Sequence, residues 1–113
     1  MNNMINLNGI CASTGIVHGS VVNIEEDVTK KTDCYIIVAK SFTPDLLYKY
    51  NKSIGFITEN GGMTCHAAIL ARVMGIPCIV GVKNATNILH TLQQVRIIGN
   101  KLGEGGEVEI INK

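Results

Sequence analysis

A glycine-rich segment that ends in a histidine carries the residues best suited to chemistry in this sequence. It reads Gly61-Gly62-Met63-Thr64-Cys65-His66, and an alanine-rich apolar run with the pattern of a helix follows it. Two adjacent glycines permit positive φ angles and let a bulky partner approach the backbone closely. The N–H groups and the dipole at the start of a helix favour a phosphate there. The pattern predicts a phosphate-binding loop with His66 in the first helical turn.

The imidazole of His66 has the chemistry of a phosphoryl acceptor. Histidine side chains in general are available in the neutral form near pH 7, so one ring nitrogen can attack phosphorus while a neighbour holds the other. Thr64 is predicted to cap the helix and is a candidate to contact the phosphate. Arg72 is expected either to form an ordinary salt bridge or to support the phosphate or a docking partner. The predicted site is the acceptor His66 with support from Gly61, Gly62, Thr64, Cys65 and Arg72.

Short β-rich runs alternate with helix signals along the chain. Strands are predicted at 21–24, 34–39, 54–58, 78–82, 95–98 and 108–111, each bounded by turn residues. Helices are predicted at 44–52, 65–74 and 86–92, the first with Thr43 as its cap and Pro44 at its first position. In the second helix, the side chains expected to face the sheet are those of Cys65, Ile69 and Val73 together with Ala68 and Ala71.

This order of elements predicts an α/β domain built in layers. The passages 34–58 and 54–82 read as strand, helix, strand, so their strands are expected to pair in parallel. A chain of 113 residues without a repeat or a linker is expected to form one domain, 1–113.

Composition and charge restrict the classes of partner. The chain is 46% hydrophobic and 17% charged, which is typical of a folded protein, and its net charge of +1 leaves no basic stripe for nucleic acid. No apolar run approaches the roughly 20 residues that span a bilayer, so we expect no membrane partner and a cytoplasmic location. The four cysteines lack the spacing of metal ligands and are expected to stay thiols.

The segment from Gly61 to Gly81 resembles the signature of the phosphohistidine swivelling domain of phosphoenolpyruvate-utilising enzymes. The matching residues are Gly61-Gly62-Met63-Thr64-Cys65-His66-Ala67-Ala68-Ile69-Leu70-Ala71-Arg72, Gly75-Ile76-Pro77 and Val80-Gly81. Weaker matches cover 15–19, 43–44 and 106–108. The motif is most similar to phosphoenolpyruvate synthase and pyruvate phosphate dikinase, although Thr14 stands where the family commonly has proline.

The resemblance implies a swivelling β/β/α fold of layered sheets with short helices, and reversible phosphoryl carriage on His66. Family members join this domain to an ATP-grasp nucleotide-binding domain and to a barrel that binds phosphoenolpyruvate or pyruvate. The 113 residues contain neither, so these partners are expected on separate chains unless the chain is an excised domain. Magnesium and ATP or phosphoenolpyruvate are expected at the partner domains, and no metal or cofactor is expected on this chain.

Two other classes of function remain to be tested. Cys65 at a helix start, where thiol pKa values fall, suggests a hydrolase nucleophile with His18 or His90 as its base. Successive helical residues point about 100° apart, which makes direct pairing of Cys65 with His66 difficult. The other alternative is a non-enzymatic regulatory or binding module that keeps the fold, and the retained His66 argues against it.

Overall fold

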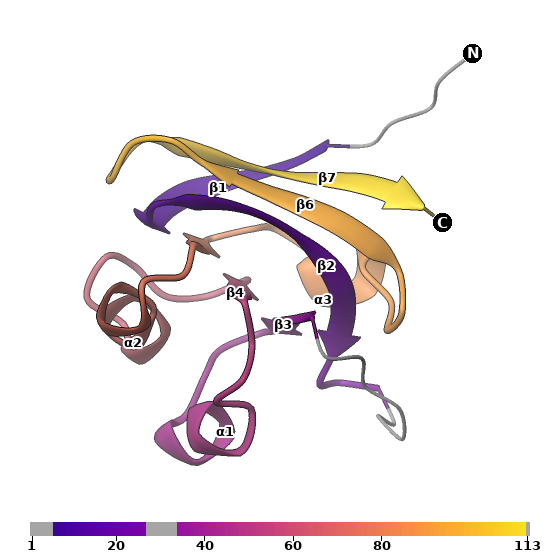
Figure 1. Cartoon of the computed structure of the whole chain (residues 1–113), viewed down its shortest axis with the longest axis horizontal. Coiled ribbons are helices and arrows are strands. Elements are labelled where there is room, and N and C mark those ends of the chain that lie inside the picture. Colours follow the sequence, from indigo (N-terminus) through magenta and orange to yellow (C-terminus); the bar gives the residue numbers. More distant parts are fainter. Residues whose placement is uncertain (1–5, 27–33, 113) are drawn as a thin grey trace.

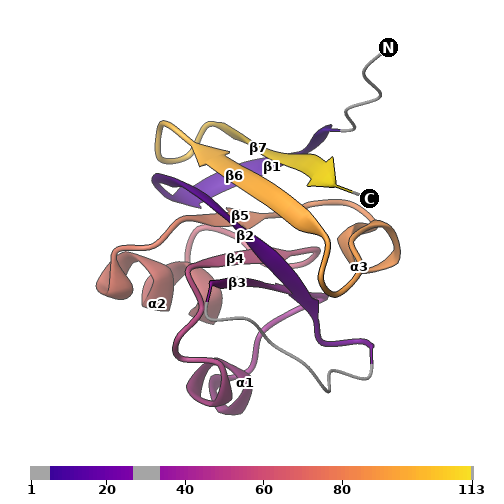
Figure 2. The same cartoon turned by 45° about the vertical axis from the view of Figure 1, so that its right-hand side comes forward.

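The strands of the chain close into one barrel, which the computed structural model describes for residues 6–26 and 34–112 (Figures 1 and 2). Around the barrel the strand order is β1-β5-β4-β3-β2-β6-β7, and β7 pairs with β1 to complete the ring. Along the chain the elements are β1 (Asn6–Ser13), β2 (Gly15–Asn23), β3 (Tyr35–Ala39), α1 (Pro44–Lys49), β4 (Gly55–Thr58), α2 (His66–Met74), β5 (Cys78–Val80), α3 (Ala85–Ile88), β6 (Gln94–Gly99) and β7 (Gly105–Asn112).

Parallel and antiparallel pairing divide the barrel into two parts. Strands β2, β3, β4 and β5 pair in parallel in that order, which confirms the parallel passages predicted from the sequence. Strands β1, β6 and β7 join the ring through antiparallel pairs. Helices α1 and α2 are the connections β3 to β4 and β4 to β5, and Figure 2 shows both away from α3. The α/β class predicted from the sequence is confirmed.

The parallel strands are apolar at successive positions because both of their faces are covered. In β3, Ile36 and Val38 belong to a cluster that includes residues of all seven strands and fills the barrel. Tyr35, Ile37 and Ala39 belong to a second cluster, between the strands and the helices α1 and α2. This two-sided burial is the usual reason why parallel strands lack polar alternation.

The N-terminal strands extend beyond the predicted ones. Strand β1 was not predicted, because its outward positions include the exposed Asn6 and Asn8 and its inward positions include Gly9. Strand β2 begins at Gly15 rather than at residue 21. Its first half was not predicted because glycines, Gly15 and Gly19, stand at two of its less exposed positions, so the sequence shows no alternation of apolar and polar residues there. Both segments are fixed by neighbouring strands rather than by their own β propensity.

Two helices are shorter than predicted, although the predicted cap of α1 is confirmed. The hydroxyl of Thr43 accepts a hydrogen bond from the Leu46 N–H at 3.3 Å. Helix α1 ends at Lys49 because Tyr50 leaves the helical region and its ring packs edge-on against Tyr35. Helix α3 covers only Ala85–Ile88, since the next residue, a buried leucine, is extended.

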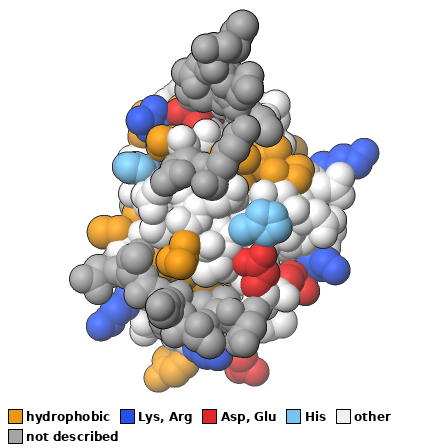
Figure 3. Space-filling view, turned by 90° about the vertical axis from the view of Figure 1, so that its right-hand side faces the viewer, with side chains coloured by type: hydrophobic (Ala, Val, Ile, Leu, Met, Phe, Trp, Pro, Cys, Tyr) orange, Lys and Arg blue, Asp and Glu red, His pale blue; other side chains and the backbone are white. Residues whose placement is uncertain are grey.

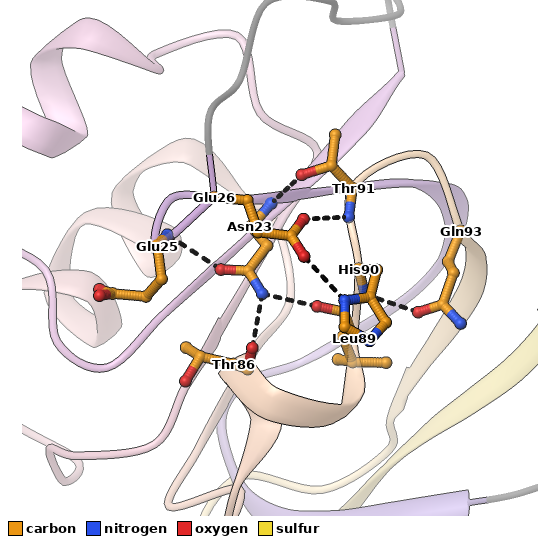
Figure 4. Close-up of polar contacts among 8 residues, drawn as sticks. All are labelled: Asn23, Glu25, Glu26, Thr86, Leu89, His90, Thr91 and Gln93. Carbon is orange, nitrogen blue, oxygen red and sulfur yellow. Dashed lines mark hydrogen bonds and ion pairs between the residues drawn. The ribbon is translucent and has the colours of Figure 1, made fainter.

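A polar cluster fastens the end of β2 to the segment after α3 (Figure 4). The Glu26 carboxylate accepts a hydrogen bond from the Thr91 N–H at 2.8 Å and pairs with His90 Nδ1 at 2.7 Å. The buried Asn23 amide donates to the carbonyl groups of Thr86 and Leu89 at 2.8 and 2.6 Å. These bonds hold α3 against β2.

The described surface carries both signs of charge. On the face shown in Figure 3, Lys and Arg side chains lie apart from one another, and a histidine lies against acidic side chains. No helix within residues 6–26 and 34–112 has the length and apolar character needed to cross a membrane.

Closure of the barrel leaves no room for a side chain at Gly9. A Cβ atom there would lie 2.5 Å from the backbone oxygen of Val80, and β1 cannot shift because it is paired on both sides. We expect Gly9→Ala to lower the free energy of unfolding by about 1–3 kcal/mol in a urea titration. The control is Gly105→Ala, where an added Cβ meets nothing within 4 Å. Equal stability of the two variants would contradict this account of the closure.

The Glu26 cluster makes stability depend on pH. Burial opposes ionisation of Glu26, but the hydrogen bonds from His90 and Thr91 outweigh it, so its pKa lies below the ordinary value. The contribution is therefore present at neutral pH and disappears as the pH falls through the folded-state pKa. We expect Glu26→Gln to lower the free energy of unfolding at pH 7 by at most about 1 kcal/mol, because solvent screens the pair, and to have less effect in acid, as urea titrations at the two pH values would measure. Glu25→Gln, at an exposed neighbour, should show no such trend.

Candidate functional site

The candidate site lies where two parallel strands end side by side. Strand β3 leads into α1 and strand β4 leads into the glycine loop, residues 59–65, which precedes α2. The loop is tied to the end of β3, because the Glu59 N–H donates to the Ala39 carbonyl at 3.1 Å and the Asn60 N–H to the Lys40 carbonyl at 2.8 Å. Carboxyl ends of parallel strands are where α/β sheets commonly bind ligands.

His66 is the first residue of α2, and its side chain is exposed. The first intrahelical bond runs from the Ile69 N–H to the Cys65 carbonyl at 3.0 Å. The N–H groups of residues 66–68 therefore lie outside the helical ladder, at the positive end of the helix dipole. The predicted place of His66 in the first helical turn is confirmed.

The predicted cap of α2 was wrong. Cys65, with an extended backbone, occupies the N-cap position and makes no side-chain bond there. Thr64 is exposed one residue earlier, so its hydroxyl does not close the helix. The N–H of Cys65 instead bonds to the Gly62 carbonyl at 3.2 Å in a turn of the loop itself, and this turn moves the helix start one residue later than Thr64 requires.

The two glycines of the loop differ in what they require. Gly61 has a φ of 109°, and a Cβ atom there would lie 3.0 Å from the Cys65 sulfur, so both conformation and space favour glycine. At Gly62 an added Cβ would meet nothing within 4 Å. Gly62 is exposed, which fits the predicted close approach of a partner to the backbone.

Helix α2 turns part of its predicted face to the barrel, because Ala68 and Ala71 are buried as expected but Ile69 and Val73 are not. Its buried residues are Ala67, Ala68 and Ala71, whose methyl groups let the helix pack closely against β1, β4 and β5. Ile69 and Val73 are 49% and 78% exposed, so their predicted burial against the sheet was wrong. The alanines occupy the inward face, and a helix cannot turn residues 69 and 73 inward at the same time.

The exposed side of α2 lines an apolar groove that begins at His66. The groove has a volume of about 370 Å³ and lies between α1 and α2. From α2 it is lined by His66, Ile69, Leu70 and Val73, which follow the spacing i, i+3, i+4 and i+7. Pro44 and Tyr48 line it from α1, and the Tyr48 side chain is 82% exposed.

Arg72 braces the glycine loop and does not line the groove with His66. Its Nε donates to the Ala12 carbonyl at 2.8 Å, and its terminal nitrogen donates to the Met63 carbonyl. It lines a separate hollow with Ser13 and Thr14. Support of a phosphate by Arg72 stays a prediction.

Cys65 and the other histidines do not form a thiol site in the described chain. The half-buried Cys65 packs against the cluster beneath α2, and burial raises the pKa of its neighbour Cys78. His90 is paired with Glu26, and His18 lies exposed on β2, opposite Arg96 of β6. Within residues 6–26 and 34–112, no three His, Cys, Asp or Glu residues gather to hold a metal ion.

Glu59 and Thr86 form a contact at the site that the sequence analysis did not identify. The Glu59 carboxylate accepts hydrogen bonds from the Thr86 N–H at 2.7 Å and from the Thr86 hydroxyl. The hydroxyl bond, opposed by burial and assisted by the Thr86 N–H and by Lys40, holds the pKa of Glu59 below its usual value. The sequence did offer a signal for Glu59, because it is an acidic residue placed directly after a strand and shortly before Gly61 and Gly62. Nothing in the sequence indicated that its partner is Thr86.

A match to a protein-family model identifies the family of this chain. The model of the PEP-utilising enzyme mobile domain matches residues 31–101, which include the glycine loop and α2. The chain belongs to this family. The resemblance inferred from the motif around His66 is confirmed.

Named relatives of this mobile domain are much longer proteins. The probable phosphoenolpyruvate synthase of Methanothermobacter thermautotrophicus is 42% identical over 89% of this chain, which spans 15% of that protein. The phosphoenolpyruvate-protein phosphotransferase of Mycoplasma genitalium is 43% identical over 78% of this chain, which spans 14% of it. A solution structure of Enzyme I matches 68% of this chain and 32% of its own, with a TM-score of 0.56 and 29% identity.

Measurements of unfolding free energy test the hydrogen bonds by which Arg72 joins α2 to β1 and to the glycine loop. Arg72→Ala removes two hydrogen bonds between α2, β1 and the loop, and we expect a loss of about 1–3 kcal/mol in the free energy of unfolding. Thr64→Ala is the matched control, because an exposed residue that caps nothing should change stability by less than about 0.5 kcal/mol. A loss near 1 kcal/mol in the Thr64 variant would contradict the structure and support Thr64 as the helix cap.

Proposed function

We propose that this mobile domain is a phosphocarrier that accepts a phosphoryl group on His66 and passes it on. The observation that carries the proposal is the exposed imidazole at the first position of α2, beside N–H groups outside the helical ladder. A phosphate on that imidazole gains hydrogen bonds from these amides and favourable interaction with the dipole. Its charge is stabilised without a metal ion on this chain.

The reaction has two balanced halves. In the first, the lone pair of one imidazole nitrogen forms a bond to phosphorus, while the bond from phosphorus to the leaving oxygen of the donor breaks. In the second, an oxygen of the acceptor bonds to phosphorus and the N–P electron pair returns to the ring. The other ring nitrogen keeps its proton throughout, so neither half needs an oxidant or a reductant.

The donor and the acceptor are proposed to be other domains. An ATP-grasp nucleotide site and a barrel that binds pyruvate or phosphoenolpyruvate would hold the substrates and the magnesium that neutralises their phosphates. The matched segment is only 15% and 12% of the length of two relatives, which supports this division of labour. The apolar groove beside His66 supports it as well, because Val73 and Tyr48 are largely exposed until something covers them.

Phosphorylation of the chain tests the acceptor. After reaction with phosphoramidate, a small donor that needs no docking, we expect an adduct on His66 that is labile in acid and stable in base. His66→Ala should abolish it, whereas His18→Ala, at an exposed histidine on β2, should retain it. Mass spectrometry of the digested protein locates the group.

Three outcomes would point to another function. A stable adduct on Thr64 alone would contradict the carrier, and a wild-type chain that takes no label from phosphoramidate, or from ATP or phosphoenolpyruvate with its partners, would favour a binding module. Hydrolase activity lost in Cys65→Ser would favour a thiol enzyme. The carrier instead requires Cys65→Ser to accept the phosphoryl group.

A further inference from the structure

The start of the glycine loop is held from two directions. On one side, backbone bonds from Glu59 and Asn60 fasten it to the end of β3. On the other side, the Glu59 carboxylate reaches α3 and accepts two hydrogen bonds from Thr86, one of them at 2.7 Å from the backbone N–H. Asn84, directly before α3, makes no side-chain cap bond, so the carboxylate is the acceptor that serves Thr86 in the described structure.

The partner of Glu59 is itself fixed. Thr86 is 7% exposed, and its carbonyl accepts a hydrogen bond from the fully buried amide of Asn23 at 2.8 Å (Figure 4). The same amide donates to the Leu89 carbonyl at 2.6 Å, so both ends of α3 are tied to β2. The carboxylate of Glu59 is therefore bound to a rigid support and not to a mobile side chain.

We propose that the Glu59–Thr86 contact is a latch that fixes the path of the glycine loop and thereby positions His66 for phosphoryl transfer. Glu59 is a positioning residue, since the loop leaves β4 at Glu59 and delivers the chain to the first residue of α2. The proposal rests on the proposed function of His66. In-line transfer tolerates little error in the place of the attacking nitrogen, which makes such a latch useful.

The latch can fail without unfolding the domain. Helix α2 is held independently by its buried alanines and by the Arg72 bridge to β1. Loss of the carboxylate leaves the backbone bonds to β3 and the Arg72 bond to Met63 but releases the start of the loop from α3. The expected result is a more mobile start of the loop and altered surroundings of His66 on an intact barrel.

Glu59→Ala in the full chain tests the latch by amide hydrogen exchange and by NMR. We expect exchange of the hydrogen-bonded loop amides, those of Asn60 and Cys65, to become about tenfold faster, the change for losing a charge-assisted hydrogen bond, while amides late in α2 keep their rates. The His66 ring resonances should shift or broaden. Glu59→Gln, which keeps an acceptor oxygen, should restore most of the protection, and Glu104→Ala, at an exposed acid of the β6–β7 hairpin, should change nothing there.

Thr86→Val probes the same contact from α3 if Glu59→Ala does not fold, because it removes the hydroxyl but keeps the backbone donor. We expect a smaller acceleration of exchange in the loop and the same direction of change at His66. Unchanged exchange and unchanged His66 resonances in the folded variants would overturn the latch.

Phosphoramidate labelling separates this result from the proposed function. The latch variants should still accept the group on His66, because a small donor does not depend on the path of the loop. Absence of the His66 adduct in the wild-type chain would contradict the carrier whatever the exchange data show. Labelling of His66 combined with an unaltered loop in the variants would contradict the latch alone.

Discussion

Ala67, Ala68 and Ala71 bury only methyl groups where α2 meets the strands of the barrel, and the close approach that they allow determines the rest of the site. With these three residues inward, His66 must point outward, and the side chains three, four and seven positions later must follow it. The exposed imidazole and the apolar groove beside it are thus two results of one packing choice. Larger side chains at the alanine positions would move the helix away from the barrel and His66 with it.

The position of the site follows from strand order more than from any single residue. Because β3 and β4 are parallel neighbours, the segments after them emerge at the same edge, and α1 and α2 become the two walls of the groove. Pro44 and His66, 22 positions apart in the sequence, line one hollow for this reason. Topology brings together groups that have no local relation.

The sequence was a good guide where the decisive interaction is local. Thr43 caps α1 because its partner, the Leu46 N–H, is three residues away, and Pro44 suits the first helical position whatever surrounds it. The same reasoning failed for Thr64, where a turn within the glycine loop gave the cap position to Cys65. A threonine near a helix start is a cap only if the preceding backbone allows it.

Contacts between distant segments were beyond the sequence. The motif located His66 and its loop, but the bond from Glu59 to Thr86 joins residues 27 positions apart, and no local pattern reveals it. Strand β1 was missed for a similar reason, since Asn6, Asn8 and Gly9 form a strand only because β5 and β7 lie on either side. The inward place of Ala68 and Ala71 was predicted correctly, whereas Ile69 and Val73 were added to the same face for their hydrophobicity although they lie on the opposite side of the helix.

Closure of the ring gives every strand of the described chain a hydrogen-bonded neighbour on each side. An open sheet would present an unpaired backbone edge, which readily recruits a strand from another molecule. For the phosphocarrier proposed above, which would be exposed to solvent between its two partner sites, such an edge would favour aggregation. The pairing of β1 with β7 removes that edge and lets the phosphohistidine proposed for this chain be carried on a self-contained unit.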